Sequence, residues 1–320
     1  MPSRNLLKIE SMILRKVKSK LETLLLKGKP VSDSIRSGLE PRVKSLNEDG
    51  IIPQLAAIII GDDPASQVYV RNKSRAFEKL NCKSHTYQLE ADSNEQDVLA
   101  LIDTLNHDEE VHGILIQLPL PGHLDSKTIL HAVSPEKDVD GFHPENLGLL
   151  LEGNPNFIPC TPHGVLEILK YYDIQVSGQH AVIVGRSNIV GKPMFALLAQ
   201  KFEMGNATVT ICHTGTKDLT AHTKQADIII AAAGSPNMIS GDMIKDGVDI
   251  IDVGINRVED DSEKGYKLVG DVNTESVMGI ANSVTPVPGG VGPMTITMLL
   301  FNTVMSAEKS RKTIANVSAL

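Results

Sequence analysis

Short apolar segments alternate with amphipathic or polar segments in two separate series along the 320-residue chain. In the first series, the segments that predict β-strands are "LAAIII" (55–60), "SHTYQLE" (84–90) and "HGILIQLP" (112–119). In the second series, they are "HAVIVG" (180–185), "ATVTICH" (207–213), "ADIIIAAAG" (226–234) and "DIIDVGIN" (249–256). Strands that alternate with helices form βαβ units, whose strands pair in parallel. The order therefore predicts an α/β protein.

A segment rich in proline, glycine and asparagine, residues 134–164, separates the two series and predicts a junction between two domains. Near the C-terminus, the start of "SVTPVPGGVGPMTITMLL" excludes a helix or a central strand, whereas an apolar helix is predicted from Met294. In chain order, the predicted parts are an extension (1–25), a first domain (26–160), a second domain (161–284), a segment that returns to complete the first domain (285–310) and a tail (311–320).

Composition excludes several classes of partner. A net charge of -8 argues against nucleic acid, and no apolar run approaches the roughly 20 residues that span a bilayer. The cysteines, Cys82, Cys160 and Cys212, are scattered, and no H-E-x-x-H motif occurs. We therefore predict neither a disulfide framework nor a metal site.

The first 30 residues contain eight Lys or Arg and only two acidic residues. This bias is typical of a mitochondrial transit peptide, but arginine and serine are sparse. A solvated extension, with Met12 as a second candidate start, is the favoured interpretation. We expect a cytoplasmic protein, with a mitochondrial one as the alternative.

The stretch "VGRSNIVGKPM" (184–194) is close to a dinucleotide-binding turn, although Ser187 stands where G-x-G-x-x-G has its second glycine. Gly185 would permit the tight turn after a strand, and Gly191 would let the next helix approach. Free N–H groups at the start of that helix would hold a pyrophosphate. Alone, the motif fits an ordinary strand–turn–helix connection equally well.

The strand that follows favours NADP over NAD. NAD-binding folds place an acidic residue at its end to bind the ribose 2′-hydroxyl. Here no acid occurs before Asp218, whereas Arg186, Thr214 and Lys217 could meet a 2′-phosphate. A surface ion pair is the alternative role for Arg186.

"YVRNK" puts Tyr69 and Lys73 four residues apart on one helix face, early in the helix after "LAAIII". Gln117 ends a parallel strand, and Asp138 and Asp140 follow one crossover later. These side chains are predicted to converge on a cleft, where a lysine of lowered pKa can act as a base. The aspartates could instead cap helices or lie in solvent. A Tyr-x-x-x-Lys pair also marks short-chain dehydrogenases, but there it follows the glycine loop, whereas here it precedes it.

The stretch "TPVPGGVGP" (285–293) lacks amide donors at its prolines and permits close approach at its glycines. A turned linker is possible, but a binding loop is favoured because a helix follows directly.

Together these stretches resemble the bifunctional methylenetetrahydrofolate dehydrogenase/cyclohydrolase family. The resemblance covers about 26–307 and is carried by "YVRNKSRA", "GILIQLPLP", "KDVDGFHPENLG", "PCTPHG", "VGRSNIVGKPM", "IDVGIN", "GDVN" and "TPVPGGVGPMT". It implies a folate-binding catalytic domain and a Rossmann-like NADP-binding domain with a cleft between them. It further implies oxidation of 5,10-methylene-tetrahydrofolate, hydrolysis of the methenyl product to 10-formyl-tetrahydrofolate, a role in purine biosynthesis and a homodimer formed through the cofactor domain.

The resemblance also implies roles for individual residues. Lys73 matches the catalytic lysine, Tyr69 the tyrosine that stacks on the folate, and Gln117 the glutamine beside the lysine. Asp140, with Asp138 beside it, matches the aspartate that binds the pterin. The loop that borders the folate contains Pro288, Gly289 and Gly290. The cofactor site contains Gly185, Arg186, Ser187, Gly191, Thr214 and Ile255.

Three alternatives stay open at this point. Thr214 stands where many NADP-dependent members have serine, and some organelle relatives use NAD with magnesium and phosphate. Other relatives lack the lysine and are dehydrogenases only, so a dehydrogenase-only NAD-dependent enzyme is the first alternative. A short-chain oxidoreductase is disfavoured by motif order. A non-catalytic nucleotide-binding protein would be expected to lack Lys73, Gln117 or Asp140, and all three are present.

Overall fold

The structure, a computed structural model, describes residues 22–261 and 265–318, without the side chains of 64–69 and 312–318. Almost all of the predicted N-terminal extension, including any transit peptide, lies outside the described residues. Within them, no helix combines the length and apolar character needed to cross a membrane.

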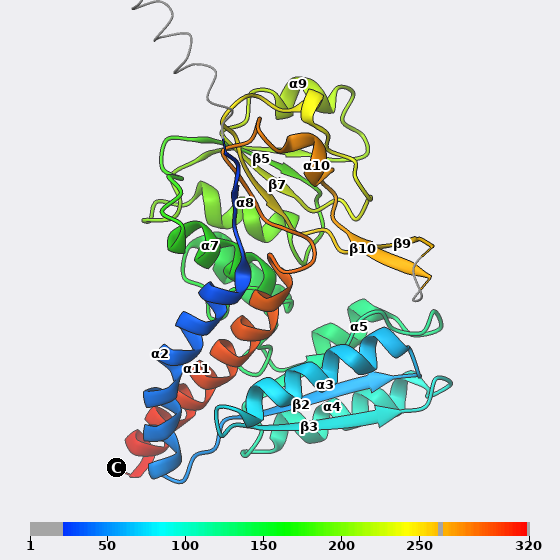
Figure 1. Cartoon of the computed structure of the whole chain (residues 1–320). Coiled ribbons are helices and arrows are strands. Elements are labelled where there is room, and N and C mark those ends of the chain that lie inside the picture. Colours follow the sequence, from blue (N-terminus) through cyan, green and yellow to red (C-terminus); the bar gives the residue numbers. More distant parts are fainter. Residues whose placement is uncertain (1–21, 262–264, 319–320) are drawn as a thin grey trace, which may run out of the picture.

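The larger of the two main sheets has six parallel strands in the order β1-β11-β8-β7-β5-β6 (Figure 1). Its strands are β1 (Leu24–Leu25), β5 (His180–Val184), β6 (Thr208–Cys212), β7 (Ile228–Ala231), β8 (Asp249–Asp252) and β11 (Ser283–Val284). The helical segments that accompany it are α8 (Gly191–Ala199), α9 (Leu219–Thr223), the 3₁₀ turn η1 (Gly241–Met243) and α10 (Thr274–Val277). The order reverses between β5 and its neighbours β6 and β7, which is the switch point where such sheets bind ligands.

The smaller sheet has three parallel strands in the order β3-β2-β4. They are β2 (Gln54–Ile60), β3 (Lys83–Leu89) and β4 (Gly113–Ile116), and β2 is buried throughout, as an apolar central strand requires. The helices of this unit are α3 (Pro64–Glu78), α4 (Glu95–His107), α5 (Ser126–Ala132) and α6 (Pro144–Glu152).

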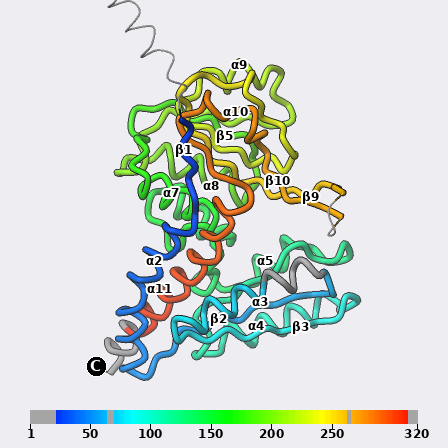
Figure 2. Tube along the Cα trace, viewed as in Figure 1, coloured from blue at the N-terminus to red at the C-terminus, as the bar shows by residue number. Residues whose placement is uncertain are grey.

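Three helices connect the two sheets: α2 (Gly28–Glu48), α7 (Cys160–Tyr171) and α11 (Gly292–Ser318). The first and last lie side by side although they stand at opposite ends of the chain (Figure 2). Arg42 of α2 joins them through a two-pronged ion pair with Glu308 of α11, at 2.8 and 2.7 Å. One hydrophobic cluster contains Leu55 of the small sheet, Met298 of α11 and Ile230 of the large sheet. The two units therefore share a core.

The α/β prediction is confirmed, but some local predictions are wrong. Leu24 and Leu25, assigned to the extension, form β1, and Ser283–Val284, where a central strand was excluded, form β11 between β1 and β8. The polar stretch after β8 forms a hairpin of β9 (Asn256–Glu259) and β10 (Tyr266–Val269). Helix α11 continues through the predicted tail to Ser318. Two-residue strands are set by tertiary pairing, so neither the composition nor the period of the sequence predicts them.

Candidate active site

Lys73 is the centre of a buried polar group in the smaller unit. It is the tenth of the 15 residues of α3, so the expectation that it lies early in the helix is wrong. Only 4% of Lys73 is exposed, and its Nζ donates a hydrogen bond to Oε1 of Gln117 at 3.2 Å. The predicted convergence of these two side chains is confirmed.

Gln117 directly follows β4, and its backbone N–H donates to the carbonyl of Ile58 in β2. Its side-chain Nε2 donates to the carbonyl of Leu118 at 2.8 Å. Because that bond fixes which end of the amide is the donor, the Oε1 acceptor faces Lys73. The glutamine thus holds the lysine by its nitrogen without adding a charge.

Asp140 supplies the charge that faces Lys73. Burial lowers the pKa of Lys73 from 10.5 to about 8, although Asp140, and then Cys160, act to raise it. Burial also raises the pKa of the Asp140 carboxyl, against the opposing effects of Lys73 and of a hydrogen bond with the Cys160 thiol. A lysine that changes its charge near neutral pH is suited to proton transfer.

Asp138 is placed differently from the predicted substrate ligand. It is 6% exposed, and its carboxylate accepts hydrogen bonds from the backbone N–H groups of Phe142 and His143 and from Nδ2 of Asn146. Burial raises its pKa to about 6 in spite of these donors. Because both of its oxygens accept hydrogen bonds from residues 142–146, Asp138 anchors the loop that contains Asp140.

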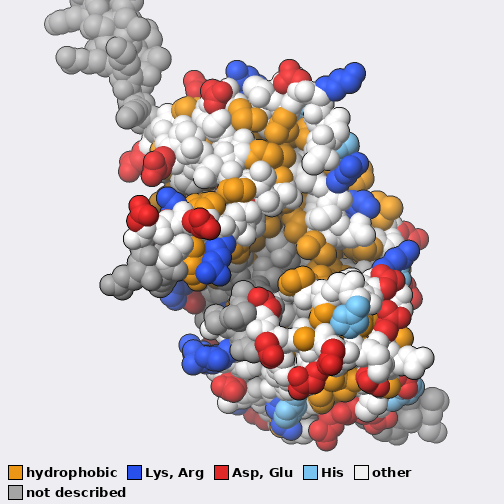
Figure 3. All heavy atoms as spheres, turned by 90° about the vertical axis from the view of Figure 1, so that its right-hand side faces the viewer, with side chains coloured by type: hydrophobic (Ala, Val, Ile, Leu, Met, Phe, Trp, Pro, Cys, Tyr) orange, Lys and Arg blue, Asp and Glu red, His pale blue; other side chains and the backbone are white. Residues whose placement is uncertain are grey.

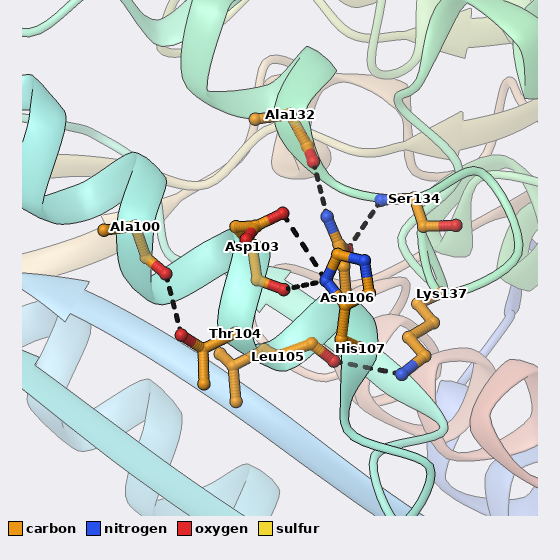
Figure 4. Close-up of polar contacts among 9 residues, drawn as sticks. All are labelled: Ala100, Asp103, Thr104, Leu105, Asn106, His107, Ala132, Ser134 and Lys137. Carbon is orange, nitrogen blue, oxygen red and sulfur yellow. Dashed lines mark hydrogen bonds and ion pairs between the residues drawn. The ribbon is translucent and has the colours of Figure 1, made fainter.

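The chain that leads into this loop is tied to the end of α4 (Figure 4). Asn106 donates to the carbonyl of Ala132 and accepts from the backbone N–H of Ser134, at 2.8 and 2.9 Å. Lys137 donates from Nζ to the carbonyl of Leu105 at 3.0 Å, near the helix C-terminus, where a cation is favoured. Hydrogen bonds to α4 therefore hold both Ser134 and Lys137, the residue that directly precedes Asp138.

The predicted folate loop lies between the two sheets. Pro288 and Gly289 are exposed, whereas Gly290 is buried. The carbonyl of Gly289 accepts from the N–H of Gly28 at 2.9 Å, and a Cβ at Gly28 would lie 1.9 Å from the carbonyl oxygen of Gly290. Only glycine at position 28 lets α2 start this close to the loop.

The glycine turn has the expected tight geometry. Gly185 has φ +133°, and a Cβ there would lie 2.1 Å from the carbonyl oxygen of Ala232. A Cβ at Gly191 would lie 2.2 Å from the carbonyl oxygen of Gly185. Both positions require glycine, because the turn packs closely against residue 232 and the start of α8 packs closely against the turn.

The start of α8 differs from the expectation of free N–H groups. Oγ of Ser187 accepts from the N–H groups of Val190 and Gly191, at 3.1 and 3.4 Å. The backbone carbonyl of Ser187 accepts from the backbone N–H of Lys192. Pro193 has no N–H. Ser187, three residues before the N-cap Val190, thus accepts from the N–H groups at the start of α8.

The surroundings of the turn suit a 2′-phosphate. Arg186 and Thr214 are exposed, and no ion pair of Arg186 occurs within the described part of the chain. Asp218, the first acid after β6, caps α9 by accepting from the N–H of Ala221 at 3.0 Å. The donor set and the glycine cradle fit NADP.

The buried carboxylates of Asp252 and Asp271 accept hydrogen bonds from loops of the large unit, and the sequence analysis did not predict them. Asp271 accepts from three successive N–H groups, those of residues 233–235, and from Nδ2 of Asn256. Asp252 accepts from the N–H groups of Gly254, Asp271 and Val272. Both lie in stretches quoted above, "IDVGIN" and "GDVN", whose aspartates directly follow or end apolar segments. They fix the loops around Ile255, which is 59% exposed.

The surface between the two units is hollowed on the face that Figure 3 shows, and hydrophobic side chains gather around the recess. Ile255 of the large unit lies beside the start of α11, with Cδ1 3.7 Å from the position of a Cβ at Gly292. The side chain of Tyr69 lies outside the described residues. Among residues that the structure describes, no group of three or more His, Cys, Asp or Glu side chains could hold a metal ion.

Two family descriptions match the chain. Residues 26–140 match "Tetrahydrofolate dehydrogenase/cyclohydrolase, catalytic domain", and residues 159–311 match its "NAD(P)-binding domain". The chain belongs to the tetrahydrofolate dehydrogenase/cyclohydrolase family. It is therefore an enzyme with both of that family's domains. The second match includes most of α11, which the sequence prediction assigned to the first domain.

Relatives in the tetrahydrofolate dehydrogenase/cyclohydrolase family are similar over nearly their whole length. The "Bifunctional protein FolD" of Chlorobium chlorochromatii is 53% identical over 290 residues, which cover 89% of this chain and 98% of the relative. The crystal structure of the bifunctional FolD enzyme from Campylobacter jejuni is 51% identical, with TM-score 0.84, and the alignment covers 90% of this chain and 99% of that one.

A third member of the family comes from Trypanosoma brucei and is described as complexed with NADP cofactor and inhibitor. It is 37% identical with TM-score 0.85, and the alignment covers 90% of this chain and 98% of that one. This similarity extends to the arrangement of both domains.

Proposed function

We propose that this protein catalyses two successive steps in one cleft. The first is the NADP-dependent oxidation of 5,10-methylene-tetrahydrofolate, and the second is hydrolysis of the methenyl product to 10-formyl-tetrahydrofolate. The observation that carries the hydrolytic step is the buried contact of Lys73 with Gln117 beside Asp140. A dehydrogenase alone does not need a lysine of lowered pKa in this position.

Lys73 is the proposed base for the attack of water. A group with pKa about 8 exchanges its proton readily near neutral pH. Gln117 orients Nζ of Lys73. The negative charge of Asp140 opposes the loss of a proton from Lys73 until substrate fills the cleft. Asp140 and Tyr69 are the proposed folate contacts, with Pro288, Gly289 and Gly290 at the border. Asp138 acts only through the loop.

The residues around the glycine turn are proposed to bind and orient NADP. Arg186 and Thr214 would hold the 2′-phosphate, and Ile255 would lie beside the nicotinamide. Gly185 and Gly191 would give the turn beside the cofactor its tight shape, and Ser187 supports that turn by accepting from the N–H groups of Val190 and Gly191. When bound, NADP supplies the acceptor for the hydride that leaves the one-carbon bridge.

The test is a paired absorbance assay of reduced cofactor and methenyl-tetrahydrofolate, with NADP and separately with NAD. Wild type is expected to reduce NADP without accumulating the methenyl product. Lys73→Ala should let that product accumulate, whereas Lys79→Ala, which removes an exposed lysine near the end of the same helix, should not. Accumulation in the wild type would contradict the hydrolytic proposal, and equal use of NAD would contradict the cofactor choice.

A homodimer through the cofactor domain, a cytoplasmic location and a role in purine biosynthesis belong to the same proposal. The support is the resemblance of the chain to its family. Sedimentation of the full chain at micromolar concentration tests the dimer, and a monomeric mass would refute it.

A further inference from the structure

The side-chain amide of Asn302 donates a hydrogen bond to the loop that contains Asp140. Asn302 lies on α11 and is fully buried. Its Nδ2 donates to the carbonyl of Val139 at 2.8 Å and to the carbonyl of Ile158 at 3.0 Å. Val139 directly precedes Asp140, and Ile158 lies in the next loop, two residues before Cys160. The side chain of Asn302 therefore joins the loop that contains Asp140 to the loop that precedes Cys160.

Cys160 adds a second connection in the same place. Its thiol lies 3.3 Å from the carbonyl oxygen of Val139, and Nδ2 of Asn302 lies 3.8 Å from its sulfur. The same thiol also lies close enough to the Asp140 carboxylate to affect its pKa. Asn302, Cys160 and the carbonyl of Val139 thus form a compact polar group directly behind the carboxylate.

The position of Asn302 has a cost that argues for a specific role. Its Oδ1 is buried and has no hydrogen-bond partner among the described residues. A buried acceptor that is left unpaired lowers the stability of the folded state. A leucine would avoid that cost, but it would leave the carbonyls of Val139 and Ile158 without this donor.

We propose that Asn302 is a positioning residue that holds Asp140 beside Lys73. This inference rests on the proposed function, in which Lys73 is the base and Asp140 controls its protonation. It adds that α11, which starts directly after the predicted folate loop, also holds the loop that contains Asp140.

The test measures the protonation of Lys73 without any folate. The full chain is labelled with acetic anhydride over a series of pH values, and the modification of each lysine is followed by mass spectrometry, with exposed Lys79 as internal reference. Within the part of the chain whose side chains the structure describes, Asp140 and Cys160 are charged or titratable groups that act on Lys73. Loosening Asp140 should remove the attraction that keeps Lys73 protonated.

We expect Asn302→Ala to lower the labelling midpoint of Lys73 by roughly 0.5–1 pH unit, in the same direction as Asp140→Asn. The double variant should show no further decrease, because both changes remove one interaction. Thr303→Ala is the matched control: Thr303 is fully buried on the same helix but donates to Leu299 in its own helix, and it should leave the midpoint unchanged.

A midpoint in Asn302→Ala that stays at the wild-type value or rises, or two single shifts that add, would overturn the inference. If Asn302→Ala does not fold, Asn302→Ser keeps one donor and should show a smaller decrease. Turnover by the wild type separately tests the proposed function: active wild type with an unmoved midpoint in the variant refutes the positioning role alone. Inactive wild type refutes the proposed function whatever the labelling shows.

Discussion

The burial of Lys73 predicts a pH-dependent cost in stability. Its pKa is 10.5 ordinarily and about 8 in the folded protein, so the folded state binds fewer protons than the unfolded state between these values. The free energy of unfolding contributed by this group therefore rises with pH through that window. At about 1.36 kcal/mol per pH unit, the full effect is roughly 3 kcal/mol, and it opposes folding at neutral pH.

Lys73→Met removes the titrating group and measures this cost. The constant effects of the substitution, such as the lost contact with Gln117, cancel when the difference between variant and wild type is followed against pH. We expect the stability of the variant relative to wild type to fall by roughly 2.5 kcal/mol between pH 8 and pH 10.5. Urea denaturation followed by circular dichroism gives each free energy, and ordinary carboxyl groups do not titrate in this range.

Lys79→Met is the control, because Lys79 is an exposed lysine near the end of the same helix. Its difference from wild type should stay level over the same pH range. A level difference for Lys73→Met would show that the lysine is not desolvated, and the reasoning about its role as a base would fail. A rising difference would mean that Asp140 outweighs burial.

Three further predictions concern the cofactor unit. Gly185→Ala would place a Cβ 2.1 Å from the carbonyl of Ala232, so NADP should bind at least about tenfold more weakly by fluorescence titration, whereas Gly148→Ala, with open space around it, should not change binding. Arg186→Ala should raise KM for NADP about 10- to 100-fold and leave KM for NAD unchanged, and equal effects on both would exclude a 2′-phosphate contact. Asp271→Asn should lower the free energy of unfolding by about 3 kcal/mol in urea, because buried amides lose a charged acceptor, and a loss below about 1 kcal/mol would contradict that role.

The parts of the site that the sequence predicted depend on the ends of parallel strands. Gln117 was found because an apolar run stops there, and parallel strands end at one edge of a sheet. Lys73 was found from its spacing on a helix that follows such a strand. These inferences need only the period of the side chains and the order of the elements, which are local properties of the sequence.

The parts that the sequence did not predict depend on backbone geometry. Asp138 and Ser187 belong to residue types that can bind a ligand or satisfy nearby N–H groups, and only the path of the loop decides between these roles. Asp271 reaches three N–H groups that lie more than 30 residues earlier in the chain. A contact of that separation leaves no trace in local pattern, so the carboxylate was read as part of a motif without a function.

The buried lysine connects the two proposed steps. At pH 7.5, a group with pKa about 8 is neutral in roughly a quarter of molecules. Loss of hydride from the substrate leaves a methenyl cation in the same cleft, and a nearby positive charge lowers the pKa of an ammonium group further. The oxidation therefore increases the fraction of Lys73 that can accept a proton from water, and it does so only when there is a cation to hydrolyse. Asp140 opposes the same change in the empty cleft, so the loop that Asn302 holds decides how far the lysine responds.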